Sequence, residues 1–274
     1  MVEPVHPVTK VRVRSLNTGT KYEIEVQTKV TGGNVEVQYC GDFAISGIEG
    51  TAAPVKISAF GMAGGITGKL LPTGRALDVL DVGGGETIGV SCLDFSRPMV
   101  MVRGSDVGMT GLETKTECDN NSSLNERMER IRRQAARLMG MGNVENQTSP
   151  KICALFSPRE SSQTIRTRYF TDPRHSDLHY ALAMTAAQCI AASCLVEGTL
   201  SRGLCNEPKL LTGTKEPEDG GREYEISIGH PSGSAQAYIT VDPTHPESSD
   251  SFLKASYVRT VRPIITGEAF YPLQ

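Results

Sequence analysis

The first eighty residues of the chain alternate between apolar and polar side chains with a period of two, which is the pattern of half-buried β-strands. Tyr22, Ile24 and Val26 would line one face of an early strand. Similar alternation returns at 224–228 and 235–241, on either side of a Gly-His-Pro-Ser-Gly sequence. We therefore predict a β-rich fold with hairpins near both ends of the chain.

One amphipathic helix is predicted in the middle of the chain. Ser123 and Glu126 fit a capping box, and the apolar side chains that follow recur at helical spacing as far as Leu138. Gly140 is expected to end this helix. Its arginines form either an anion-binding face or the solvated flank of a packed helix: they are Arg127, Arg130, Arg132, Arg133 and Arg137.

A second predicted helix, over 178–196, has apolar or small residues on every side, with Ser176 or Asp177 as its cap. A helix that is apolar all round is surrounded by protein. In a β-rich chain of this size, we expect such a helix to run through a curled sheet or barrel. The fold class predicted from the residues is therefore α+β.

Composition narrows the classes of function. The chain has 274 residues and a formal net charge of −3, which is a poor match for nucleic acid because nucleic-acid affinity depends on basic surface. Seven cysteines without ligand spacing favour reduced thiols in a cytoplasmic protein over a disulfide framework or a metal site. The apolar stretch at 178–196 contains too little hydrocarbon to predict a membrane span.

Three places combine loop geometry with polar groups that could hold an acid. The first is a Gly/Pro loop that carries Lys69, Thr73 and Gly74, the second is the turn with Ser232 and Gly233, and the third is His179 near the start of the second helix. Backbone N–H groups, cations and hydroxyls in such places can bind a carboxylate or phosphate. Each place is also consistent with an ordinary turn or a helix cap. Together they predict an acid-binding site without metal ligands.

The order of several short motifs resembles the PrpF family, the 2-methylaconitate cis–trans isomerases and their relatives, which include aconitate Δ-isomerases and 4-oxalomesaconate tautomerase. These motifs are Thr-Gly-Lys-Leu-Leu-Pro-Thr-Gly at 67–74, Arg-Pro-Met-Val-Met-Val at 97–102, Asp-Val-Gly-Met-Thr-Gly at 106–111, Ser-Pro-Lys-Ile-Cys at 149–153, His-Tyr-Ala-Leu-Ala-Met-Thr-Ala at 179–186 and Gly-His-Pro-Ser-Gly at 229–233. The resemblance runs from about residue 11 to the C-terminus, and the ordered set is more specific than any one motif.

The resemblance implies a diaminopimelate-epimerase-like fold, in which two similar half-domains each curl a sheet around a central helix. On this basis 1–54 would be residual strands of the N-terminal half-domain. The C-terminal half-domain would span 55–250 with its central helix at 178–196, and 251–274 would hold strands that return to the N-terminal half. The resemblance also implies catalysis without a metal or an organic cofactor.

The chain also departs from the family pattern. Family members begin with a first half-domain that carries a lysine and a Gly-Asn-Cys-Gly-Asn motif, the source of the expected base and thiol. Neither occurs here, so we expect the N-terminal part with these groups to be missing, and the catalytic residues stay unassigned. The residues that the resemblance carries over would hold substrate: Lys69, Thr73, Gly74, His179, Ser232 and Gly233. Strands left without their helix would expose an apolar face that finds a partner.

Two functions are therefore considered. The first is a cofactor-independent isomerase that moves a proton across an allylic C=C of a small di- or tricarboxylate, such as an aconitate, a methylaconitate or an alkyl homologue. The alternative is a non-catalytic truncated remnant that binds polycarboxylates or pairs with a full-length relative. The expected partners are a small unsaturated polycarboxylate and a second copy or a full-length relative, with neither nucleic acid nor membrane.

Overall fold

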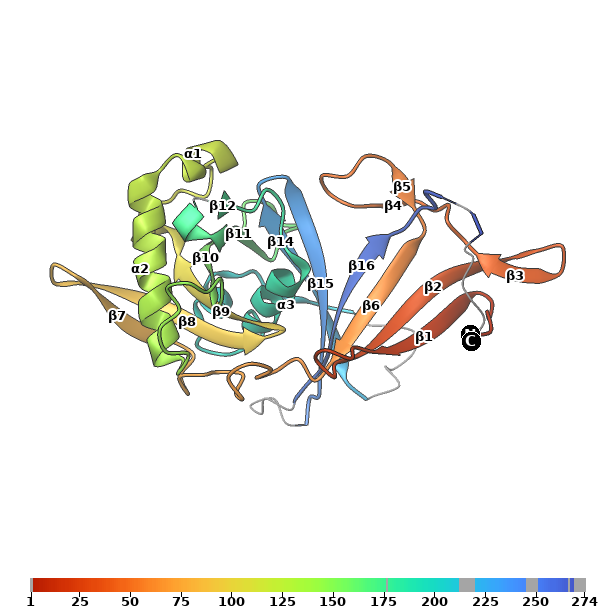
Figure 1. The fold of residues 1–274 in the computed structure, drawn as a ribbon, viewed down its shortest axis with the longest axis horizontal. Helices are drawn as coiled ribbons and strands as arrows, with labels where there is room; N and C mark the ends of the chain where they lie inside the picture. Colours follow the sequence, from red (N-terminus) through yellow and green to blue (C-terminus); the bar gives the residue numbers. More distant parts are fainter. Residues whose placement is uncertain (1, 176, 212–219, 245–250, 266, 269–274) are drawn as a thin grey trace.

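The computed structural model describes residues 2–175, 177–211, 220–244, 251–265 and 267–268 (Figure 1). The strands in these ranges are β1 (Val8–Arg14), β2 (Lys21–Thr31), β3 (Asn34–Val37), β4 (Phe43–Ala44), β5 (Thr51–Ala52), β6 (Pro54–Phe60), β7 (Asp78–Gly83), β8 (Glu86–Phe95), β9 (Arg97–Arg103), β10 (Lys151–Phe156), β11 (Ile165–Asp172), β12 (Asp177–Leu178), β13 (Lys209–Leu210), β14 (Arg222–His230), β15 (Gly233–Val241) and β16 (Phe252–Thr260). The helices are α1 (Lys115–Asp119), α2 (Ser122–Leu138), α3 (Met184–Ser193) and α4 (Leu200–Leu204), with 3₁₀ turns η1 (Gly104–Val107) and η2 (Pro173–His175).

One large mixed sheet organises the chain. Its main path runs β1-β2-β6-β16-β15-β14-β11-β10-β9-β8-β7, with parallel pairing of β9 with β10 and of β11 with β14. The path ends at β7 on one side and at β1 on the other. The described strands therefore form an open, curled sheet, and the closed barrel considered from the sequence is not found among them.

Helix α3 lies inside the curl, as its all-round apolarity predicts. Every residue from Ala186 to Ser193 is buried, and the helix packs against β8, β9, β14, β15 and β16. The predicted bounds of 178–196 are too long. Residues 177–178 form β12 instead, and Ala183 is the N-cap, with no side-chain cap. The helix is therefore about 15 Å long, at 1.5 Å per residue.

Strands β9 and β10 are apolar over most of their length because both of their faces are covered. On β9, Met99 and Met101 belong to the core around α3, whereas Val100 and Val102 belong to a second core beneath α2. Figure 1 shows α2 on the outer side of these strands, with α3 on the inner side. The curled sheet therefore encloses α3 on its inner side, and this fixes the position of the N-terminal end of the helix.

The start of α2 differs from the predicted capping box. Asn121 is the N-cap, and its side chain accepts a hydrogen bond of 3.0 Å from the Leu124 N–H. Ser123 is exposed inside the first turn. At the other end Leu138 is 48% exposed, so it does not continue the buried face predicted for this helix.

This cap leads to a stability prediction. Asn121→Ala removes the acceptor for one otherwise unpaired N–H and is expected to lower the free energy of unfolding by about 1 kcal/mol. Ser123→Ala is the matched control and should leave it within about 0.5 kcal/mol of wild type. Urea denaturation of the two variants measures both values. An equal loss in both would contradict the assignment of Asn121 as the cap.

Toward β1 the sheet has an apolar face that is less buried than the rest. Val11 pairs with Ile24, and Ile24 pairs with Ile57 of β6, so these side chains share one face of the sheet. All three are partly exposed. In Figure 1 the helices gather around the β7–β11 side, with none drawn beside β1 and β2. These three apolar side chains therefore lie on a partly exposed face of the sheet. None of the described helices is both long enough and apolar enough to span a membrane.

Candidate functional site

A cavity of about 190 Å³ lies next to the segment that leads into α3, and we call it the site cavity. Its wall combines the segment 43–48, residues 180–182 just before the α3 N-cap, and the turn between β14 and β15 with His230 and Ser232. The segment 43–48 consists of β4 and the turn that follows it, and we call it loop 43–48. Neighbouring positions on β15 and β16 complete the wall, including Arg259. The cavity therefore brings together segments that are far apart in the sequence.

The contact between loop 43–48 and the turn depends on glycine. Gly233 has φ +136°, and a Cβ built there would lie 2.6 Å from Cβ of Ser46. A Cβ at Gly47 would lie 3.2 Å from Oγ of Ser232. Because neither glycine carries a side chain, the loop can close against the turn and form one wall of the site cavity.

His230 and Ser232 form a polar pair in this wall. Nδ1 of His230 lies 3.2 Å from Oγ of Ser232, and His230 is 9% exposed. Burial lowers the pKa of His230 to about 4, and the nearby His179 and Arg168 add to this effect. The His230 imidazole is therefore neutral near pH 7, and it can donate or accept a hydrogen bond without carrying charge.

The electrostatics of the site cavity favour an anion. Of the described residues that line it, Arg259 alone carries a formal charge near neutral pH, and no lining side chain is a carboxylate. The α3 N-terminus, without a side-chain cap at Ala183, adds the positive end of a helix dipole. Arg168 does not line the cavity, but its charge acts on His230, and its guanidinium donates to backbone carbonyls, including that of Gly111 at 2.9 Å. These positive groups favour an anion over a cation in the cavity.

The structure brings together some of the residues predicted to bind substrate. Ser232 lines the cavity, and Gly233 contacts the loop that closes it. His179 stands directly before the lining residue Tyr180, and its Nδ1 accepts a hydrogen bond of 3.1 Å from the Ala181 N–H. Its predicted place at the start of the helix is wrong, because α3 begins five residues later, at Met184.

The structure does not bring the Gly/Pro loop to this cavity. Oγ1 of Thr73 donates to Asp78 at 2.6 Å, and Gly198, beyond the C-terminal end of α3, packs against Ala76. In Figure 1 the segment between β6 and β7 runs on the opposite side of α3 from the β14–β15 turn. The prediction that Lys69, Thr73 and Gly74 share one site with Ser232 is therefore corrected, because α3 lies between them.

Several residues of this cavity were not predicted from the sequence. His230 stood inside a quoted motif but was not chosen, although a histidine beside Pro-Ser in a tight turn is a recognisable signal. Arg259 lies in a sequence that predicts only a strand, so nothing in it indicates a binding site. Loop 43–48 carries no motif, so only the folded chain reveals its role.

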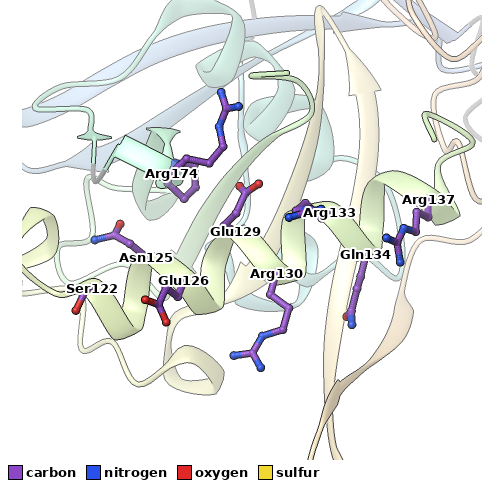
Figure 2. Close-up of a pocket in the computed structure, with 10 residues that line it drawn as sticks. Ser122, Asn125, Glu126, Glu129, Arg130, Arg133, Gln134, Arg137 and Arg174 are labelled. Atoms are coloured by element: carbon purple, nitrogen blue, oxygen red, sulfur yellow. The ribbon is translucent and has the colours of Figure 1, made fainter. Parts of the chain in front are cut away.

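A second hollow of about 490 Å³ follows the outer face of α2, and its side chains are drawn in Figure 2. Glu129 and Arg174 point to one side of the helix there, whereas Arg130 and Gln134 point to the other. Several of its cations are already paired, with Arg174 on Asp172 at 2.7 Å and Arg133 on Glu145 at 3.1 Å. This pattern favours the solvated flank over an anion-binding face.

Of the other arginines on α2, Arg132 is 1% exposed and binds both carboxylate oxygens of Glu129, at 2.7 and 2.8 Å. Arg127 pairs with Glu86. Arg132 also donates to the backbone carbonyl of Val144 at 3.0 Å, so both side chains hold neighbouring segments in place. Within the described ranges, no group of three His, Cys, Asp or Glu side chains is arranged to hold a metal ion.

The comparisons with known proteins identify the family. The sequence model of the PrpF protein family matches residues 1–272. The Escherichia coli (strain K12) protein YbhH is 37% identical over 273 residues, which are 99% of this chain and 69% of YbhH. The 4-oxalomesaconate tautomerase of Pseudomonas putida is 32% identical over 234 residues, 85% of this chain and 58% of that protein.

A crystal structure of methylitaconate-delta-isomerase superposes with a TM-score of 0.78 at 27% identity, covering 100% of this chain and 71% of that one. This chain and methylitaconate-delta-isomerase therefore share a fold. The expectation of an isomerase is confirmed, because the relatives with a named activity are isomerases or tautomerases.

The family match begins at residue 1 and gives no support to the expected missing N-terminal part. The chain belongs to the PrpF family.

Proposed function

We propose that the chain is a cofactor-independent isomerase that moves a proton across an allylic C=C of a small di- or tricarboxylate. The observation that carries this proposal is the charge of the site cavity, which is lined by Arg259 and by no carboxylate side chain among the described residues. The names of the relatives, a 4-oxalomesaconate tautomerase and a methylitaconate-delta-isomerase, support an unsaturated carboxylate. An aconitate, a methylaconitate or an alkyl homologue would fit this class.

Ser232 and His230 supply the polar contacts for one carboxylate. Because the His230 imidazole is neutral, its Nδ1–H can donate to Oγ of Ser232 at 3.2 Å. The Ser232 hydroxyl is then free to donate to a carboxylate oxygen in the cavity. Arg259 in the same wall would bind a second carboxylate, since a guanidinium can make two parallel hydrogen bonds to one carboxylate.

The same groups would assist the proton shift. Removal of an allylic proton places negative charge on the conjugated carboxylate as a dienolate. Donors that are already in position stabilise this charge more than that of the ground state, and so lower the barrier. Arg168 contributes through its charge, because it is 7% exposed and its guanidinium is held by backbone carbonyls. Ser232, His230 and Arg259 are therefore assigned to holding the substrate and its developing charge.

We also propose the diaminopimelate-epimerase-like arrangement for the chain. Residues 1–54 would belong to one half-domain, 55–250 to the other with α3 as its central helix, and 251–274 would return to the first. β16 pairs with β15 and with β6, and β6 pairs in turn with β2, so β6 is the strand through which 251–274 would reach the first half. The site cavity, between loop 43–48 and the β14–β15 turn, would then lie between the two halves.

Proton exchange tests the activity. We expect incubation of the chain with trans-aconitate in deuterated water to give 1,3-exchange and a shifted double bond by NMR. Binding of the same acid, measured separately by calorimetry, distinguishes an inactive binder from an active isomerase. Binding without exchange would favour the non-catalytic alternative, for which the relatives give no support. Neither binding nor exchange, with any small unsaturated polycarboxylate, would contradict the proposal.

The Gly/Pro loop offers a negative control for this site. Thr73→Val removes the hydroxyl that donates to Asp78 and leaves the site cavity untouched. We expect the variant to bind trans-aconitate with wild-type affinity in the same calorimetric experiment. Its free energy of unfolding should fall by about 1 kcal/mol, which urea denaturation measures. A loss of binding would show that the Gly/Pro loop does belong to the binding site.

A further inference from the structure

The site cavity has an apolar part beside its polar one. Leu182 and Ala235 line the cavity, and both also contribute to the hydrophobic core around α3. Ile45 and Ile48 of loop 43–48 line it as well. Leu182 and Ala235 are held in place by the core, whereas Ile48 is 50% exposed, so the loop supplies a part of the wall that borders solvent.

The charged group of the cavity lies beside this apolar part. Ala237 of β15 pairs with Tyr257 of β16, and Ala237 belongs to the core around α3. Two residues further along each strand are Ala235 and Arg259, which share this face because side chains alternate along a strand. Cζ of Arg259 lies 5.1 Å from the centre of the Tyr257 ring. Arg259 therefore has apolar and aromatic neighbours on its own face of the sheet.

The cavity has few groups that can hold a third carboxylate. Ser232 and Arg259 are each assigned to one carboxylate of the substrate, and no other lining side chain among the described residues is a cation near neutral pH. Ser234 and Gln236 alternate with Ala235 along β15, so their side chains point to the opposite face of the strand. A third carboxylate would lose water without gaining an ionic partner, which is costly.

We propose that the site cavity selects an alkyl-branched unsaturated dicarboxylate over a tricarboxylate, with Ile48 as a specificity-determining residue. The two carboxylates bind Ser232 and Arg259, and the alkyl branch on the double bond packs against Ile48 and Leu182. This inference rests on the proposed function, because it places the substrate in the same cavity. It adds the chemical class of the third substituent.

A matched series of four acids tests this selection. Fumarate, methylfumarate and ethylfumarate carry hydrogen, methyl and ethyl on the same unsaturated dicarboxylate, and trans-aconitate carries carboxymethyl at that position. Calorimetry with the full chain should show an affinity that rises about 4-fold with each added carbon, because each is removed from water. trans-Aconitate should bind about 10-fold more weakly than ethylfumarate, since its branch carries an unpaired charge.

A variant should change the preference between the last two acids. Ile48→Arg places a cation in the apolar part of the wall, at a position exposed enough to accept it. We expect the affinity for trans-aconitate relative to ethylfumarate to rise about 10-fold, through a charge-assisted hydrogen bond. Leu16→Arg is the matched control, because it adds the same charge at a residue that is 96% exposed and outside the cavity. Its ratio of affinities should equal that of wild type.

The ratio compares two ligands on one variant, so it does not depend on the fraction of the variant that folds. Tighter binding of trans-aconitate than of ethylfumarate by the wild-type chain, or equal affinities for fumarate and ethylfumarate, would overturn the inference and leave the isomerase proposal unaffected. An unchanged ratio in Ile48→Arg would overturn the role of Ile48. Failure of all four acids to bind would contradict both the inference and the proposed function.

Discussion

His230→Asn is expected to remove a loss of stability that the wild-type chain suffers between pH 6.5 and pH 4. Burial holds the pKa of His230 near 4 in the folded chain, with His179 and Arg168 adding to the effect, whereas the unfolded chain has the ordinary value of 6.5. Between these values the unfolded state binds more protons than the folded state, so stability falls as the pH falls. The free energy of unfolding is therefore about 3 kcal/mol higher above pH 6.5 than below pH 4 on account of His230.

Urea denaturation across this range measures the effect. Wild type should lose stability steeply toward pH 4, and His230→Asn should lose about 3 kcal/mol less over the same range. His175→Asn, at an exposed histidine, is the control: its surface pair with Asp172 contributes at most about 1 kcal/mol, so its pH dependence should stay much closer to that of wild type. Asp172 acts in a lower window, because the hydrogen bond from Arg174 lowers its pKa to about 2 and its contribution is lost only below its ordinary value of 3.8. An unchanged pH dependence in His230→Asn would contradict a buried neutral imidazole.

The all-round apolarity of α3 predicted its buried place within a curled sheet, because composition alone shows when no side of a helix can face water. The same pattern did not locate the start of the helix. Leu178 is buried in β12 as fully as Ile190 is buried in α3. Apolar character at these positions therefore reports burial, and only the backbone pairing of β12 with β11 separates strand from helix.

The site was harder to predict than the core, since it depends on contacts between distant segments. Ser232 was predicted from its turn, but loop 43–48 reaches it only because Gly47 and Gly233 leave room. Lys69 and Thr73 belong to a loop of equally suitable composition that lies at the other end of α3. Local sequence describes what a loop can bind, and the path of the sheet decides which loops meet.

Ser232→Ala is expected to weaken binding of trans-aconitate about 10- to 150-fold and to raise KM to a similar degree. The hydroxyl donates to a charged carboxylate, and a hydrogen bond to a charged group contributes about 1.5–3 kcal/mol. His230 would also lose the partner of its Nδ1, at 3.2 Å in the wild-type chain. Calorimetry with trans-aconitate and steady-state kinetics measure the two effects.

Ser162→Ala is the matched control for this change, because its hydroxyl contacts only Glu160 among the described residues and lies outside the site cavity. Its affinity and KM should equal those of wild type. If Ser232→Ala lowers kcat with KM unchanged, the hydroxyl acts in the transition state alone, since uniform binding affects KM and not kcat. If both constants and the affinity stay at wild-type values, the turn at Ser232 does not contact the substrate, and the carboxylate must be held by Arg259 and the N-terminus of α3 without it.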